Sequence, residues 1–380
     1  MAQKPTSRSL SRKLATVDGR RSAVARLPAV LVLYTGGTFG MVESRGEGTA
    51  LRLPKLDPAG LKRRLLKHVP ELRGLARCEV KILMNCDSAH LGGAQWVQIA
   101  REIQSSWNRF DGVVLLHGTD TLAYTASALS LLLRPCLKPV IVTGAQRPLA
   151  ALRSDARRNL ISAVEIAAHG PRPGIQQICV FFDDQLFRGN RVRKRSAQEF
   201  GAFESGPAHV LAEVGTAIRY RDEVRRPTVS TVDHAPALDL ARVILPIFTA
   251  RVATFVVTPD FPAEAVRSGL LNRLDALILV VFESLTAPTQ DPALVALLRA
   301  ARKKGVPVVV TTEGRLEAQS RAAYPAGEAL WREGCAWAGE MTPECAYVKT
   351  RLILSQPHGR RQFTELWYKD WAHEGAPLPE

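Results

Sequence analysis

Two short stretches place threonine hydroxyls directly behind glycine turns, each at the end of an apolar run. The first covers residues 35–38 (TGGT), and the second covers residues 117–121 (HGTDT). A threonine hydroxyl becomes a useful nucleophile when a base takes its proton or a neighbouring cation eases its ionisation. Backbone N–H groups in such turns are fixed donors that can stabilise an oxyanion. These features together indicate acyl transfer to or from a small polar substrate.

Other polar residues in the chain provide groups that can assist such a hydroxyl. Asp120 lies next to Thr119, and Lys194 provides an ammonium group further along the chain, so the three form a possible proton relay. Asp87 and Ser88 provide a further carboxylate and hydroxyl. Such groups can hold the amino and carboxylate ends of an amino acid. The predicted substrate is therefore small and polar.

Each of these motifs also has a purely structural interpretation. A Gly-Gly-Thr turn often serves as a tight turn or a helix cap, and it matches neither a Walker A motif nor a dinucleotide-binding signature. The side chains at 119–120 can cap the helix expected from Leu122, and those at 87–88 can form another cap. Lys194 lies among arginines, a pattern typical of a solvated surface. Only the joint order of the motifs favours chemistry.

Alternating strands and helices are predicted to hold these turns. Apolar runs typical of buried strands cover residues 28–34, 80–84, 112–117, 138–143 and 177–182. Helical patterns cover residues 57–68, 94–107, 122–133 and 156–168. This alternation predicts an α/β fold with a larger N-terminal, mostly parallel, doubly wound sheet domain. The polar turns follow the strands, where ligands of such sheets bind.

The chain length favours a second, smaller domain. The sequence predicts four segments: a basic, disordered tail at 1–27, a catalytic domain at 28–220, a linker at 221–240, and a smaller C-terminal α/β domain at 241–372. In the smaller domain, strands are expected at 242–247, 253–257, 276–281 and 306–311, and helices at 262–271, 291–303 and 343–354. The residues from about His373 have the composition of a polar chain end.

Composition limits the classes of function. The formal net charge is +15, and residues 1–27 hold seven basic side chains against one acidic one, so much of the charge lies in the tail. The tail also shares the Arg/Ser-rich, acid-poor character of organelle transit peptides. No apolar run approaches the roughly 20 residues that cross a bilayer. The six cysteines and eight histidines show no metal or disulfide spacing, which indicates buried thiols in a reducing compartment and no metal site.

The motifs resemble those of bacterial-type L-asparaginases. Residues 34–41 (YTGGTFGM) and 117–121 resemble the family's two signatures. Further matches follow in the family's order and spacing at 87–88, Trp96, 144–148, 154–155, 186–191 and Lys194. The pattern is most similar to the type I, cytoplasmic branch, from about Val30 to Gln356.

The resemblance implies a two-domain amidohydrolase that converts L-asparagine to L-aspartate and ammonia without metal or cofactor, with L-glutamine as a possible second substrate. It assigns roles to six residues: Thr38 as nucleophile, Thr119, Asp120 and Lys194 as a supporting triad, Ser88 and Asp120 as ligands of the substrate's α-carboxylate and α-ammonium, and Asp87 beside them. It also implies a homodimer or a dimer of dimers, in which a second-domain loop of the neighbouring subunit completes each site.

The chain departs from the family pattern in four places. No tyrosine occurs in the loop between Met41 and Ala50, where relatives place one over the substrate, and Ala89 replaces a polar residue. In the loop at 283–288, which is expected to reach across the dimer, Thr286 is nearest the position where relatives usually have an asparagine. Gly314 stands where type I relatives place a cysteine of the allosteric site, so allostery is not expected.

Two alternative functions remain at this point. The family includes the ammonia-supplying subunit of a tRNA-dependent amidotransferase, and the basic charge suits tRNA. That subunit carries an extra N-terminal domain, for which residues 1–27 are too short and too polar, so a nucleic-acid partner is not expected. The second alternative is a weakly active binding or regulatory protein on the same scaffold. The four candidate catalytic residues argue against it, because folding alone does not require them together.

Overall fold

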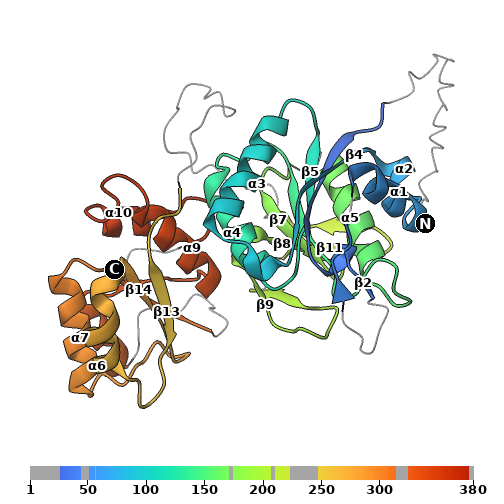
Figure 1. The fold of residues 1–380 in the computed structure, drawn as a ribbon. Helices are drawn as coiled ribbons and strands as arrows, with labels where there is room; N and C mark the ends of the chain where they lie inside the picture. The colour runs from blue at the N-terminus through green and yellow to red at the C-terminus, as the bar shows by residue number, and fades with distance from the viewer. Residues whose placement is uncertain are drawn as a thin grey trace, which may run out of the picture.

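A computed structural model describes residues 26–43, 51–55, 57–170, 174–206, 210–222, 247–313 and 324–375. These residues form a large N-terminal sheet domain and a separate, smaller C-terminal sheet domain, which confirms the predicted fold class (Figure 1). The predicted tail lies almost entirely outside the described residues, as do most of the linker, most of the loop at 43–50, and nearly all of the strand predicted at 242–247.

The large domain is built on an eight-stranded sheet of order β12-β11-β8-β7-β6-β5-β1-β4. Its strands are β1 (Ala29–Gly36), β4 (Arg77–Cys86), β5 (Gly112–Leu116), β6 (Val140–Thr143), β7 (Ile178–Phe182), β8 (Gln185–Arg188), β11 (Val210–Val214) and β12 (Ile218–Tyr220). Strands β4, β1, β5, β6 and β7 are parallel, as predicted. Strands β8, β11 and β12 extend the sheet antiparallel, which the sequence analysis did not predict.

Helices cover both faces of this sheet, because its central strands are apolar on both faces. Along β1, Val30, Val32 and Tyr34 pack into one core, whereas Leu31 and Leu33 pack into the other. The described helices of this domain are α1 (Pro58–His68), α2 (Leu72–Leu75), α3 (Gly93–Ser106), α4 (Leu122–Leu132) and α5 (Ala156–His169). Four of them match predicted helices, whereas the short α2 was not predicted.

Two small antiparallel pairs complete the large domain. Strands β2 (Val42–Glu43) and β3 (Leu51–Arg52) pair with each other on either side of residues 44–50. Strands β9 (Val192–Lys194) and β10 (Phe203–Ser205) form the second pair, and β9 carries Lys194. Single 3-10 turns precede or follow the strands at η1 (Thr38–Gly40), η2 (Ser88–His90) and η3 (Gly189–Arg191).

The small domain contains a parallel four-stranded sheet of order β13-β14-β15-β16. Its strands are β13 (Val252–Val256), β14 (Ala276–Val281), β15 (Val308–Thr312) and β16 (Ala336–Trp337), and its helices are α6 (Ala263–Ala265), α7 (Pro292–Lys303), α8 (Pro325–Arg332), α9 (Pro343–Leu354) and α10 (Phe363–Tyr368). The helix predicted at 262–271 is irregular, because α6 continues as a π-turn and a 3-10 turn. Helices α8 and α10 were not predicted.

Helix α9 joins the two domains. It packs against α4 of the large domain (Figure 1). There, Tyr124 and Tyr347 meet edge to face with ring centroids 5.8 Å apart. The prediction of a polar chain end is wrong for Glu374, which is fully buried and paired with Lys349 of α9. Within the described chain, no helix has the length and apolar character that a bilayer crossing requires.

Candidate active site

The candidate site lies where the direction of the sheet's connections changes. From β1 the chain crosses to β4 on one side, and it then returns to β5 on the other side of β1. At such a switch point the loops after neighbouring strands separate and leave a crevice at the strands' carboxyl ends. Thr38 follows β1, and Thr119 follows β5. The topology therefore brings together the two threonine turns that the sequence analysis singled out.

Glycines allow these turns to touch. Gly36 and Gly37 have φ values of 117° and 81°, a region that residues with a Cβ rarely adopt. A Cβ on Gly37 would lie 2.5 Å from the backbone nitrogen of Gly118, so no side chain fits between the two turns. Because Thr38 and Thr119 each follow one of these touching glycines, both lie within one residue of the contact. Thr38 is half-buried at the start of η1.

The turn after β4 joins the same cluster. Ser88 is 2% exposed, and its Oγ lies 2.6 Å from the position of a Cβ built on Gly118. The Thr121 hydroxyl donates to the Ser88 carbonyl at 2.7 Å, which ties the turn to the start of α4. Asp87 is exposed, and its carboxylate accepts from the Ala89 N–H at 2.9 Å. The capping interpretation thus describes Asp87, whereas the Ser88 side chain lies against the threonine turn.

Lys194, the last residue of β9, bonds to the second threonine turn. Its Nζ donates to Thr119 Oγ1 at 2.8 Å and to Asp120 Oδ1 at 2.6 Å. Thr119 is 7% exposed, and the side chains of Lys194 and Asp120 are 17% and 65% exposed. An ammonium held by a carboxylate beside a hydroxyl can polarise that hydroxyl and pass protons through it. Asp120 keeps an open side toward solvent, where a substrate ammonium can approach.

This arrangement contradicts two of the structural interpretations. The N-cap of α4 is Thr121, and no side chain caps this helix, so the groups at 119–120 are not caps. Lys194 is not a solvated surface lysine, because it is mostly covered and bonded to both groups. The pairing thus favours a chemical role for the three residues.

The buried His117 fixes the orientation of the second threonine turn through two hydrogen bonds. His117 Nδ1 lies 2.7 Å from the Gly118 carbonyl, and its Nε2 lies 2.9 Å from Thr125 Oγ1. Burial lowers the pKa of His117 to about 4, so the ring is neutral at pH 7. A carbonyl only accepts, so the single ring proton is on Nδ1, and Thr125 donates to Nε2. Because the peptide is trans, the held carbonyl also sets the direction of the Thr119 N–H.

A further loop braces the residues around Lys194. The buried Asp155 carboxylate accepts from the Gln146 and Arg147 N–H groups at 2.9 to 3.1 Å. Burial raises the pKa of Asp155, and the hydrogen bonds from these N–H groups oppose that rise. Gln146 Nε2 in turn donates to the Glu199 carbonyl at 3.1 Å, in the loop that follows Lys194.

Models of two protein families match the chain. The model described as Asparaginase, N-terminal matches residues 29–226, and the model described as Glutaminase/Asparaginase C-terminal domain matches residues 251–366. The chain belongs to the asparaginase family. This confirms the resemblance found in the motifs, and it makes the protein an asparaginase-type hydrolase.

Individual asparaginases show the same relationship. The chain is 36% identical to L-asparaginase 1 of Escherichia coli (strain K12) over 333 residues, which cover 86% of this chain and 92% of the relative. It superposes on the crystal structure of L-asparaginase I from Vibrio cholerae with a TM-score of 0.77 and 33% identity, over 93% of this chain and all of that one. It is also 29% identical to one of the subunits of the Glutamyl-tRNA(Gln) amidotransferase of Pyrococcus horikoshii, over 92% of this chain and 77% of the relative.

The candidate site contains supporting residues to which the sequence analysis assigned no role. Gln146 and Asp155 lie in stretches that the motif comparison included without a function. His117 is part of the second signature, yet its position at the end of a buried strand was the only signal of a structural role. No feature of the sequence indicated a role for Thr125, because its partner His117 becomes a neighbour only when α4 forms.

Proposed function

We propose that this asparaginase hydrolyses L-asparagine to L-aspartate and ammonia through an acyl-enzyme on Thr38. The observation that carries the proposal is the contact between the two glycine turns at the switch point, with Lys194 bonded to Thr119 and Asp120. This contact supports the proposal, because a half-buried hydroxyl, a polarised hydroxyl and an ammonium–carboxylate pair then lie near the two touching turns.

The proposed reaction has two steps. Thr38 Oγ attacks the side-chain amide carbon, and the hydroxyl proton passes to the leaving nitrogen. The C–N bond of the tetrahedral intermediate then breaks, which releases ammonia and leaves an ester on Thr38. Water then attacks the ester, its proton returns to Thr38 Oγ, and aspartate is released. The N–H groups of the two turns stabilise the negative oxygen in each step. Thr119 and Lys194 assist these proton transfers, with Asp120 holding the ammonium of Lys194.

The substrate's amino acid end is proposed to bind between the turn after β4 and the turn before α4. Ser88 donates to the α-carboxylate, and the open side of Asp120 accepts from the α-ammonium, with Asp87 beside them. Neither binding step requires a metal or a cofactor. The departures at Ala89 and in the loop after Met41 favour modest activity or an altered preference between asparagine and glutamine.

Ammonia release from asparagine and from glutamine tests the proposal. The purified protein is compared with Thr38→Ala and with Thr35→Ala as a matched control, because Thr35 donates to the Leu116 carbonyl at 2.9 Å inside the sheet. We expect the Thr38 variant to lose turnover on the order of 10⁴-fold, and the control to retain most of it. Wild-type turnover no higher than that of Thr38→Ala would favour the binding or regulatory alternative. A salt-sensitive mobility shift with tRNA would favour the amidotransferase alternative.

The remaining expectations about organisation are also proposed. We infer domains at 28–220 and 241–372 joined by a linker at 221–240, a tail at 1–27 that deletion removes without loss of turnover, and a cytoplasmic protein whose six cysteines are free thiols. A homodimer or dimer of dimers is proposed, with the loop at 283–288 completing the partner's site. Limited proteolysis tests the boundaries, cell fractionation tests the location, and light scattering after size exclusion tests the oligomer.

A further inference from the structure

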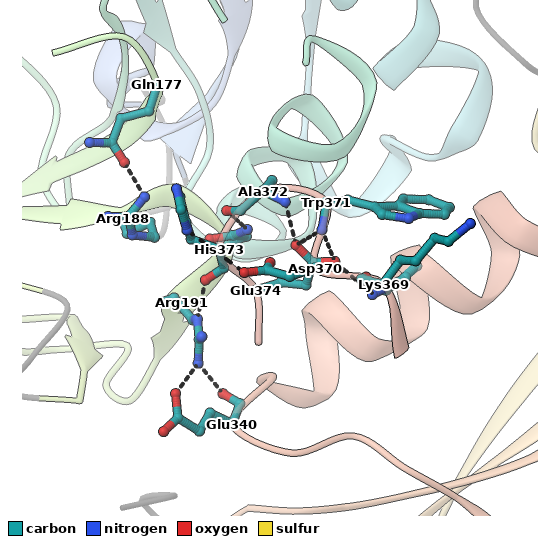
Figure 2. Close-up of polar contacts among 12 residues, drawn as sticks. Gln177, Arg188, Arg191, Glu340, Lys369, Asp370, Trp371, Ala372, His373 and Glu374 are labelled. Atoms are coloured by element: carbon teal, nitrogen blue, oxygen red, sulfur yellow. Dashed lines mark hydrogen bonds and ion pairs between the residues drawn. The ribbon is translucent and has the colours of Figure 1, made fainter. Parts of the chain in front are cut away.

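The last described residues of the chain return to the large domain near the strand that carries Lys194. We call residues 369–375 the C-terminal strap. Two of its carbonyls face the turn η3. Asn190 Nδ2 donates to the Ala372 carbonyl at 2.8 Å. Arg191 Nε donates to the His373 carbonyl at 2.8 Å (Figure 2). A second Arg191 nitrogen donates to the Glu340 carbonyl and carboxylate, each at 3.0 Å.

The strap is itself held firmly by the small domain. Lys349 of α9 pairs with Glu374 at 2.6 Å, with both side chains fully buried, and also donates to the Lys369 carbonyl at 2.7 Å. The Glu374 carboxylate accepts from the Trp371 and Ala372 N–H groups at 2.6 to 3.0 Å (Figure 2). A buried ion pair with satisfied hydrogen bonds fixes its neighbours closely. The strap is therefore a rigid anchor for Arg191.

The chain leads directly from this anchor to Lys194. Arg191 is the last residue of η3, and β9 begins at the next residue and ends at Lys194. The Arg191 carbonyl accepts from Ser205 Oγ at 2.7 Å, and Val192 is fully buried, so the start of β9 is fixed on both sides. Pairing with β10 holds the three residues of β9 extended, so a shift at Arg191 is transmitted to Lys194 with little loss.

The contact between Arg191 and the strap leaves no spare room. Gly375 has a φ of 60°, and a Cβ on it would overlap the Arg191 guanidinium. The Arg191 side chain is 5% exposed, although three of its hydrogen bonds go to residues 340 and 373, outside the large domain. The large domain thus relies on the second domain and the strap to place a residue next to its own β9.

We propose that Arg191 is a positioning residue for Lys194, and that the C-terminal strap sets its place. The inference rests on the proposed role of Lys194. An ammonium that must reach both Thr119 and Asp120 tolerates displacements of only about 0.5 Å before the geometry of the relay is lost. The strap thereby makes the placement of Lys194 depend on the docking of the two domains.

A double-mutant cycle tests the inference. Arg191→Lys keeps the charge but loses the paired donors, and Gly375→Ala pushes on the guanidinium from a residue that touches no reacting group. We expect each to lower kcat for ammonia release about 10-fold with less than a 2-fold change in KM. In a Lys194→Met background, the same changes should lower the residual kcat less than 2-fold, because the residue they position is gone.

Arg351→Lys is the matched control, since Arg351 also donates to two backbone carbonyls, those of Ala250 and Phe248, at 3.1 and 3.2 Å. It should shift Tm as Arg191→Lys does and leave kcat unchanged. The inference would be overturned if the variants lowered kcat by the same factor in the wild-type and Lys194→Met backgrounds. A kcat of Arg191→Lys equal to that of Arg351→Lys would overturn it as well. A Lys194→Met enzyme as fast as wild type would instead refute the proposed relay, so the two failures are distinguishable.

Discussion

Two lysine–carboxylate pairs in this asparaginase have the same length and opposite surroundings. Lys194 and Asp120 lie 2.6 Å apart with side chains 17% and 65% exposed, whereas Lys349 and Glu374 lie 2.6 Å apart with both side chains fully buried. The first pair contacts a threonine hydroxyl, because Lys194 donates to Thr119 Oγ1 at 2.8 Å. The second is enclosed by backbone groups and by two tryptophan rings, Trp367 and Trp371, 5.6 and 5.3 Å from the ammonium.

The difference in burial indicates a chemical role for the Lys194–Asp120 pair and a structural role for the Lys349–Glu374 pair. A pair whose carboxylate is largely exposed contributes little to stability, and it keeps part of that carboxylate free for a ligand. A buried pair loses hydration, so it is tolerated only where every partner is satisfied, and removing one partner leaves an uncompensated charge. We therefore expect the first pair to affect mainly turnover and the second to affect mainly folding.

Lys194→Met tests the first half of this contrast and should have the largest effect. We expect kcat for ammonia release to fall about 10³-fold, or about 4 kcal/mol, because the Thr119 hydroxyl loses its polarising partner. The free energy of unfolding should change by less than about 1 kcal/mol. Steady-state kinetics and urea denaturation measure both. A stability loss larger than the kinetic loss would reverse the assignment of this pair.

Lys349→Met tests whether the buried Lys349–Glu374 pair affects mainly folding. Glu374 would remain buried without its cation, and we expect a loss of about 3 kcal/mol in the free energy of unfolding. Urea denaturation measures it, with Lys369→Met as a control because that lysine pairs with Glu365 on the surface. The kcat of the folded fraction should fall far less than in Lys194→Met. An unchanged urea midpoint would contradict the architectural role.

The turn that carries Thr119 and Asp120 is held in place by the buried His117. Burial lowers the pKa of His117 to about 4 from an ordinary value of 6.5, so the unfolded chain binds more protons between these two pH values. Stability contributed by the neutral ring is therefore present above pH 6.5 and lost as pH falls toward 4. From pH 7 to pH 5 this loss is about 2 kcal/mol. Urea denaturation at several pH values should show a flatter profile for His117→Asn, and identical profiles would contradict the prediction.

The combined variant Lys349→Met, Glu374→Gln should have the smallest effect. Neither residue then carries a charge, and the glutamine oxygen still accepts from the backbone N–H groups of the strap. We expect the free energy of unfolding to lie within about 1 kcal/mol of wild type. Urea denaturation beside Lys349→Met measures the recovery. No recovery would mean that shape, rather than charge, dominates at this site.

Long apolar runs made much of the fold predictable. The run before Gly118 and the helix pattern after Leu122 correspond to β5 and α4, because a strand buried on both faces needs continuous apolar residues. The antiparallel strands β8, β11 and β12 were not predicted, and neither were α8 and α10. These elements are only three to eight residues long, so packing against neighbours decides them more than local sequence does.

The site was predictable in its residue types but not in its partners. Glycines followed by threonines after two strands indicated a crevice, and the topology brings those turns into contact. The sequence could not separate a helix cap from a relay at Thr119 and Asp120, because Lys194 is 75 and 74 residues away from them. It also described the end of the chain as polar, although Glu374 is buried.

The family, the fold class and the residues able to do chemistry follow from the sequence alone, since periodicity and motif spacing are local properties of a chain. Which charged residues meet, and how much water they keep, depends on the folded structure. Lys194 and Lys349 are the same residue type, yet long-range packing leaves the partner of one largely exposed and encloses the other pair fully. The physical reason is that the hydration of a charge depends on the whole fold around it.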